Sequence, residues 1–213
     1  MEPDALFFDF DGVLVDSEPV HYQCWREIVR PLSIDLTWDY YRRECIGVTD
    51  RAMLEALVRA AQAPVTLDQL WPHYPRKKAL FRERMLRRVP IPDNVKALLA
   101  ELYRHYRLAL VTSSGRAEVE PLLEAAGVRG FFHTLVFGED VARHKPAPDP
   151  YLLAARRLSV QRPLVFEDSA AGLESARAAG FQVIQVSKPG ELASLVRRQL
   201  GCATRPSEWS QPE

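Results

Sequence analysis

Short hydrophobic runs and longer amphipathic segments alternate along most of this chain. Apolar runs that predict buried strands occupy residues 5–8, 107–112, 134–137, 163–166 and 182–186. Hydrophobic positions at helical spacing predict helices over residues 93–105, 117–126, 150–158, 171–179 and 191–200. Strands that alternate with helices predict an α/β fold, with a parallel sheet covered by helices on both faces.

The stretch between the first two predicted strands has a different pattern. It shows helical spacing and no alternating run, with helices expected from about residue 19 and over residues 37–43, 50–63 and 67–88. An insertion of about seventy residues is too long for an ordinary connection within a sheet. We therefore predict an α/β core from residues 1–16 and 89–200, a small all-helical domain over residues 17–88, and a polar mobile tail at residues 201–213.

Two carboxylates follow the first predicted strand. Asp9 and Asp11 come directly after the apolar run, and Gly12 then permits a sharp turn. Ligands bind at the carboxyl ends of parallel strands, and two anions held close together must share a proton or a cation. The pair therefore suits magnesium-assisted phosphoryl transfer, in which one carboxylate attacks phosphorus and the other handles a proton. On these residues alone, an acidic turn after a strand explains the pattern equally well.

Polar side chains also follow three other predicted strands. Thr112 and Ser113 offer hydroxyls and N–H groups for a phosphate cradle, or simply cap the next helix. Lys145 lies among prolines that fix its backbone, so its ammonium is a candidate partner for a carboxylate and a phosphate rather than a solvated surface group. Glu167 and Asp168 follow the fourth strand, either as the second half of a cation site or as a favourable acidic helix start.

Composition and charge exclude several other classes of function. The 28 basic residues balance the 28 acidic ones, so no overall field attracts nucleic acid or an anionic membrane. No apolar stretch reaches the roughly 18 residues of a spanning helix, and the acidic N-terminus is unlike a secretory signal. The widely spaced Cys24, Cys45 and Cys202 form no disulfide framework or metal motif. We expect a soluble cytoplasmic protein that binds neither nucleic acid nor membranes; its oligomeric state is left open, and a monomer is compatible with the sequence.

The four polar strand ends, in this order, resemble the motifs of the haloacid dehalogenase-like hydrolase superfamily. The resemblance covers residues 5–188 and is carried by DFDGVLVDSE, the strand that ends at Thr112, KPAPDPY and FEDSAAG. It implies a Rossmann-like core with a helical cap inserted after the first motif. Within the superfamily, the chain is most similar to the group that contains β-phosphoglucomutase and small sugar-phosphate or phosphoglycolate phosphatases.

The resemblance also implies a role for each motif residue. Asp9 would be the nucleophile and Asp11 the general acid and base. Thr112, with the amide of Ser113, would bind the phosphate. Lys145 would hold both the nucleophile and the phosphate.

A magnesium ion is part of the same expectation. Its ligands would be Asp9, the backbone carbonyl of Asp11 and Asp168, with Glu167 either a direct ligand or one layer behind. Dehalogenases of the superfamily share the first aspartate, so Asp11 is the better sign of phosphorus chemistry.

The cap is expected to set substrate specificity. His21 stands where the mutase subgroup has a histidine that assists proton transfer, although a structural histidine satisfied by a neighbour is an equal alternative. The loop IGVTDR resembles the cap loop that faces the active site, which makes Gly47, Asp50 and Arg51 candidate substrate contacts. Lys77 or Lys78 matches a further cap phosphate ligand, but a solvated helix face is the simpler interpretation.

The expected function is a Mg²⁺-dependent phosphatase that acts on a small phosphorylated metabolite through an aspartyl phosphate. A phosphosugar mutase is the alternative, but Asp50 stands where mutases carry an arginine for the distal phosphate, and Arg51 comes one position later. A non-catalytic phospho-aspartate signalling module is a further alternative, although such modules have no helical insertion after the first strand. His144 also replaces the glycine that commonly precedes the motif lysine.

Overall fold

The computed structural model describes residues 2–46, 50–61 and 64–201. Gly47 and residues 202–213, which include most of the predicted tail, lie outside this range. The described residues form two compact units, one made by Asp16–Pro90 and the other by the residues before and after it. The two ends of the Asp16–Pro90 unit meet, because the N–H of Asp16 donates to the carbonyl of Pro90 at 3.1 Å.

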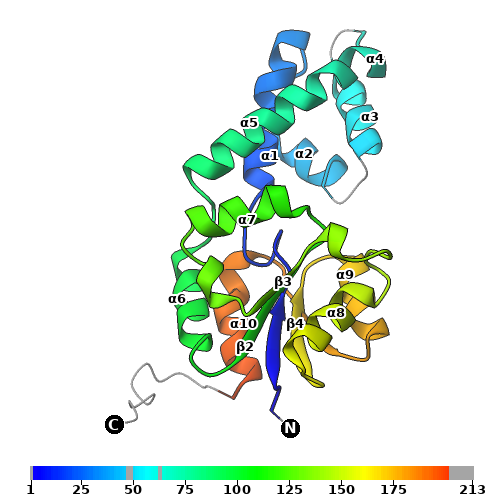
Figure 1. Cartoon of the computed structure of the whole chain (residues 1–213). Helices are drawn as coiled ribbons and strands as arrows, with labels where there is room; N and C mark the ends of the chain where they lie inside the picture. The colour runs from blue at the N-terminus through cyan, green and yellow to red at the C-terminus, as the bar shows by residue number, and fades with distance from the viewer. Residues whose placement is uncertain (1, 47–49, 62–63, 202–213) are drawn as a thin grey trace. The chain divides into compact units, whose positions relative to one another are not determined.

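The discontinuous unit is built on a five-stranded parallel sheet in the order β3-β2-β1-β4-β5 (Figure 1). The strands are β1 (Ala5–Phe8), β2 (Arg107–Val111), β3 (Thr134–Val136), β4 (Pro163–Glu167) and β5 (Gln182–Gln185). The central strand β1 is entirely apolar and fully buried, as expected for a strand covered on both faces. Phe8 pairs with Leu110 on one side and with Phe166 on the other, so the strands end close together. The predicted α/β fold is confirmed.

Helices cover both faces of this sheet. They are α6 (Asp93–Leu102), α7 (Arg116–Ala125), α8 (Asp149–Leu158), α9 (Ala170–Ala178) and α10 (Leu192–Gln199), with short 3₁₀ turns at η3 (Arg129–Phe131), η4 (Gly138–Asp140) and η5 (Pro189–Glu191). Helices α8 and α9 pack together against the sheet, whereas α6 and α10 pair on the opposite face (Figure 1).

The alternation of side chains along β1 supplies both layers of the core. Phe7 belongs to a buried cluster with Tyr151 of α8 and Ala176 of α9. Phe8 points to the other face and stacks on Phe166 of β4, with ring centroids 5.2 Å apart. Each face of the sheet is thus anchored by one aromatic side chain of the same strand.

The regular elements of the other unit, among its described residues, are all helices. Its elements are α1 (Glu18–Val29), η1 (Arg30–Leu32), α2 (Trp38–Glu44), α3 (Asp50–Ala60), α4 (Leu67–Leu70), η2 (Trp71–His73) and α5 (Tyr74–Arg87). Trp25, Leu54 and Leu57 contribute to its own hydrophobic core. Pro72 and Pro75 divide the segment expected to be helical over residues 67–88 into α4, η2 and α5, because each proline lies in the first turn of the element that follows it.

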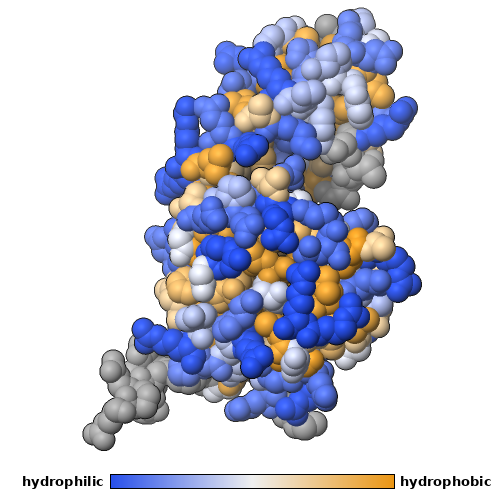
Figure 2. Space-filling view, in the orientation of Figure 1, coloured by the Kyte–Doolittle hydropathy of each residue, from blue (hydrophilic) through white to orange (hydrophobic). Residues whose placement is uncertain are grey.

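The face of each unit that Figure 2 shows carries many polar side chains. The exposed large hydrophobic side chains, Trp38, Trp71, Leu86 and Tyr103, are spread over different segments. Within the described ranges, none of the helices has both the length and the apolar character needed to cross a membrane.

Candidate active site

The turn after β1 brings two of the predicted acids to the carboxyl end of the sheet. Asp9 is buried, and its N–H donates to the carbonyl of Phe166 at 3.0 Å, which continues the pairing of β1 with β4. Gly12 has a φ of 75°, a conformation that favours glycine. A Cβ at Gly12 would also collide with the carboxylate of Asp168. Gly12 therefore permits both the turn and the close approach of Asp168.

Lys145 links the two acidic strand ends. Its Nζ donates to Oδ1 of Asp9 at 2.6 Å, to Oε1 of Glu167 at 2.5 Å and to the carbonyl of Val111 at 3.0 Å. The side chain is only 4% exposed, so the alternative of a solvated surface lysine is wrong. The ammonium thus joins groups from the ends of β1, β2 and β4.

Glu167 is fully buried and surrounded by donors. Its Oε1 accepts from the Tyr151 hydroxyl at 2.9 Å as well as from Lys145. Its Oε2 accepts from the N–H of Asp168 at 3.0 Å and from both the N–H and the hydroxyl of Ser169 at 3.1 Å. Glu167 is therefore the buried anchor of Lys145 and of the turn after β4.

Two further residues belong to this arrangement, although the sequence pattern does not single them out. Tyr151 lies in a predicted helix, and its hydroxyl reaches Glu167 from α8. Gly172 lies in the first turn of α9, where a Cβ would overlap the carboxylate of Glu167. The KPAPDPY and FEDSAAG segments contain both residues, and only the packing of α8 and α9 shows what they do.

Electrostatics at this site follow from burial and from an excess of negative charge. Burial, reinforced by the charge of Glu167, raises the pKa of Asp9 well above its usual value despite the opposing effect of Lys145. Burial and the charge of Glu167 raise the pKa of Asp168 to about 6. Burial lowers the pKa of Lys145, but the charges of Asp9 and Glu167 outweigh it and raise the pKa above its ordinary value. The lysine therefore stays charged.

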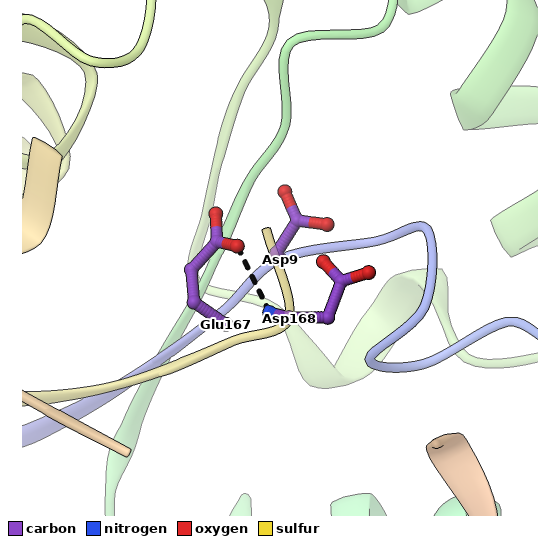
Figure 3. A group of neighbouring side chains, drawn as sticks. All are labelled: Asp9, Glu167 and Asp168. Carbon is purple, nitrogen blue, oxygen red and sulfur yellow. Dashed lines mark hydrogen bonds between the residues drawn. The ribbon is translucent and has the colours of Figure 1, made fainter. Parts of the chain in front are cut away.

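The three acids form a group that fits a cation. One carboxylate oxygen from each of Asp9, Glu167 and Asp168 lies within 4.8 Å of the other two. Figure 3 shows the three side chains close together at the ends of β1 and β4. The single ammonium of Lys145 cannot balance these three carboxylates. Oxygen donors at this spacing suit a hard divalent cation.

Asp11 stands apart from this group. Its carboxylate is not among the three clustered acids; Oδ2 of Asp11 instead accepts a hydrogen bond from the Ser114 hydroxyl at 3.3 Å. Asp11 also forms an isolated bridge with Val15, which fixes the backbone of the turn. The two aspartates of the first motif thus have different surroundings.

The hydroxyl-bearing loop after β2 lies between β2 and α7. Thr112 is buried, and its Oγ1 accepts from the N–H of Ser114 at 3.0 Å, whereas Ser113 is exposed. Gly115 occupies the N-cap position of α7 without a side-chain bond, and the Thr112 hydroxyl closes the preceding turn, so the alternative of a helix cap plus a turn describes the local structure of this loop. The first N–H of α7 instead donates to Glu139, at 2.9 Å.

In the helical unit, His21 has a close neighbour. Its Nδ1 bonds the Nζ of Lys77, and its ring stacks on Phe81 with centroids 3.8 Å apart. Lys77 is 6% exposed, and its Nζ lies 5.7 Å from the centre of the Trp25 ring. The interpretation of Lys77 as part of a solvated helix face is therefore wrong, whereas Lys78 is exposed. Burial, followed by the charge of Lys77, lowers the pKa of His21 to about 3, so the imidazole is neutral.

The other predicted cap contacts are only partly described. Arg51 is exposed and pairs with Glu55 one helical turn later, at 3.0 Å. Asp50 begins α3, but its side chain is not described, and Gly47 lies outside the described residues. Cys24 and Cys45 are free, buried thiols.

Comparisons with known proteins agree with this architecture. Residues 6–186 match the family model of the haloacid dehalogenase-like hydrolases. The chain is 33% identical over 184 residues to a phosphorylated carbohydrates phosphatase of Thermotoga maritima, which covers 85% of this chain and 83% of that protein. It is 35% identical over 192 residues to the fructose-1-phosphate phosphatase YqaB of Escherichia coli, which covers 85% of this chain and 95% of the relative.

Solved structures give the same result. A Thermotoga maritima protein with a provisional β-phosphoglucomutase assignment superposes with a TM-score of 0.75 and 27% identity, over 92% of this chain and 99% of that one. CbbY from Rhodobacter sphaeroides, solved in complex with phosphate, superposes with a TM-score of 0.61 and 29% identity, over 86% of each chain. The chain therefore belongs to the haloacid dehalogenase-like hydrolases, the family of these phosphatases.

Proposed function

We propose that the chain is a magnesium-dependent phosphatase that hydrolyses a small phosphorylated metabolite, with sugar phosphates as the leading class. One observation carries this proposal. A buried lysine, Lys145, holds the carboxylate of Asp9 at the end of the central strand, at 2.6 Å, beside an acidic group suited to a cation. Such an arrangement presents a fixed carboxylate to an incoming phosphoryl group.

The proposed magnesium ligands are the carboxylates of Asp9 and Asp168 and the backbone carbonyl of Asp11. Glu167 is proposed to bond the residues around the ion rather than the ion itself, because both of its oxygens already accept hydrogen bonds from protein donors. When bound, the ion would neutralise charge on the carboxylates and on the phosphoryl oxygens.

In the first step, an oxygen of Asp9 attacks phosphorus while the bond to the leaving oxygen breaks. Lys145 keeps Asp9 in place and offsets negative charge at the reacting centre. Asp11 gives its proton to the leaving alcohol. The product of this step is an aspartyl phosphate on Asp9.

In the second step, water hydrolyses the aspartyl phosphate. Asp11, now a carboxylate, takes a proton from the attacking water and so returns to its starting state. Thr112 and the amide of Ser113 are proposed to bind the phosphoryl oxygens in both steps, because the loop that carries them follows β2 at the same edge of the sheet.

The names of the relatives support the substrate class. The two phosphatases compared above are named for phosphorylated carbohydrates and for fructose 1-phosphate. CbbY from Rhodobacter sphaeroides has also been solved, as a variant, with xylulose 1,5-bisphosphate. A phosphorylated carbohydrate is accordingly the first class of substrate to test.

Phosphorus NMR on the purified chain with Mg²⁺ tests the proposal directly. The panel contains fructose 1-phosphate, phosphoglycolate, and β-glucose 1-phosphate with a trace of its bisphosphate. Release of inorganic phosphate that is abolished in Asp9→Asn supports the proposed phosphatase. Conversion to glucose 6-phosphate without phosphate release would identify a mutase instead, and wild-type activity in a folded Asp9→Asn variant would remove the proposed nucleophile.

A further inference from the structure

We propose that Ser114 is a positioning residue that orients Asp11 for proton transfer to the leaving alcohol, and that the site is thereby adapted to phosphate esters of alcohols. This inference rests on the proposed function, in which Asp11 is the general acid. Ser114 is distinct from the phosphate-binding residues Thr112 and Ser113 proposed above. Its role is to act through Asp11.

The contact between Ser114 and Asp11 joins two strand ends. The Ser114 hydroxyl donates to Oδ2 of Asp11 at 3.3 Å. Phe8 of β1 lies opposite Leu110 of β2, so the turns that follow these strands emerge side by side. Both side chains are partly buried, which limits competition from water for this hydrogen bond.

The backbone of Ser114 is held on both sides. Its N–H donates to Oγ1 of Thr112 at 3.0 Å, and its carbonyl accepts from the N–H of Gly138 at 3.1 Å. Gly138 packs so closely that an added Cβ would lie 2.5 Å from the carbonyl oxygen of Ser113. The hydroxyl of Ser114 is therefore placed by the fold before any substrate arrives.

The hydrogen bond with Ser114 restricts the orientation of the Asp11 carboxyl group. With Oδ2 bonded to the Ser114 hydroxyl, the other carboxyl oxygen of Asp11, Oδ1, is the one proposed to give its proton to the leaving oxygen. When the bond from Asp9 to phosphorus forms and the ester bond breaks, the electron pair of that ester bond stays on the leaving oxygen. This oxygen takes the proton from Oδ1, and Asp11 becomes a carboxylate that still accepts from Ser114.

Such an arrangement matters only for some leaving groups. An alkoxide is a poor leaving group and needs the proton as the ester bond breaks, whereas p-nitrophenolate leaves readily without it. Correct orientation of Asp11 should therefore affect alkyl phosphates much more than aryl phosphates. A residue that binds the phosphoryl group, or one that only supports the fold, would affect both classes equally.

The test compares kcat/KM for fructose 1-phosphate, phosphoglycolate and p-nitrophenyl phosphate, because kcat/KM reports the steps up to formation of the phosphoenzyme. Ser114→Ala removes the hydroxyl and Ser114→Thr retains it. Ser194→Ala is the control, since that exposed serine bonds only its own helix start, at Glu191, among the contacts described. Thermal unfolding of each variant checks the fold.

We expect Ser114→Ala to lower kcat/KM for the alkyl phosphates by about tenfold, which is part of the full contribution of a general acid. For p-nitrophenyl phosphate, we expect kcat/KM to fall by less than about twofold. Ser114→Thr should restore most of the loss. Equal losses for both classes, or none, would overturn the role of Ser114 while Asp9→Asn remained inactive. An active Asp9→Asn would instead overturn the proposed function itself.

Discussion

Replacing Gly172 by alanine sets two physical effects against each other. Gly172 lies in the first turn of α9, and a glycine-to-alanine change within a helix ordinarily stabilises a protein by up to about 1 kcal/mol. Here the added Cβ would overlap three atoms of the Glu167 carboxyl group. Helix propensity therefore predicts a gain in stability, whereas the overlap with the Glu167 carboxyl group predicts a loss.

The size of the loss follows from the partners of Glu167. Glu167 cannot move away from the new methyl group without stretching its bonds to Lys145 at 2.5 Å and to Tyr151 at 2.9 Å. Breaking a buried ion pair costs about 3–5 kcal/mol. After subtraction of the helix term of about 1 kcal/mol, we expect Gly172→Ala to lower the free energy of unfolding by about 2–4 kcal/mol.

Urea and thermal unfolding of the full chain measure this effect. A loss of about 3 kcal/mol corresponds to a Tm lowered by roughly 6–12 °C for a protein of this size. Gly130→Ala is the matched control, because a methyl group added there would have no heavy atom within 4 Å and its φ is not positive. That control should change the unfolding free energy by no more than about 0.5 kcal/mol.

A Gly172→Ala variant as stable as the Gly130→Ala control would refute this expectation. Such a result would mean that Glu167 has an alternative position that keeps its charge compensated. Turnover provides a second measure, since displacement of Glu167 also frees Lys145 to move from Asp9.

Three further predictions concern individual side chains. Lys145→Met should lower the unfolding free energy by about 3–5 kcal/mol and abolish turnover, because it leaves the buried carboxylates of Asp9 and Glu167 uncompensated. Urea unfolding and phosphate release test this prediction, and retained activity would contradict it. Asp168→Ala should raise the Mg²⁺ concentration for half-maximal activity at least about tenfold, and an unchanged titration would move the metal site elsewhere. The pKa of His21 is about 3 when folded and near 6.5 when unfolded, so its contribution to stability is complete above about pH 6.5 and declines as the pH falls toward 3. Between pH 7 and pH 5 the wild type should therefore lose about 2 kcal/mol more than His21→Gln in urea unfolding, and parallel losses would refute this.

The sheet could be predicted because each strand is a short apolar run bounded by polar or turn residues. The run at residues 5–8 coincides with β1, and the other predicted strands differ by one residue at their ends. Helix ends are harder to predict, since the first predicted helix of the core extends to His105 but α6 ends at Leu102. Helical spacing does not reveal where the last turn tightens and the helix stops.

The candidate site was predictable to the extent that parallel strands end together. This rule brought Asp9, Lys145 and Asp168 to one edge of the sheet without any knowledge of packing. It could not reveal the burial of Lys77, because that depends on how α1 and α5 pack around the aromatic rings of the helical unit. The rule also could not show whether Glu167 bonds Lys145 or binds a cation directly, because an acid at a strand end can do either.

The hydrogen bond between the N–H of Asp16 and the carbonyl of Pro90 has a consequence for how this architecture diversifies. It joins the first and last residues of the helical unit at 3.1 Å, so the insertion enters and leaves its host at a single point. The entropic cost of closing such an insertion rises slowly with its length, by about 0.6 kcal/mol for each doubling. An inserted segment of another length whose ends meet in the same way is therefore compatible with the same pairing of β1 and β2. The helical unit and the sheet with its acidic strand ends are thus separable segments of one gene.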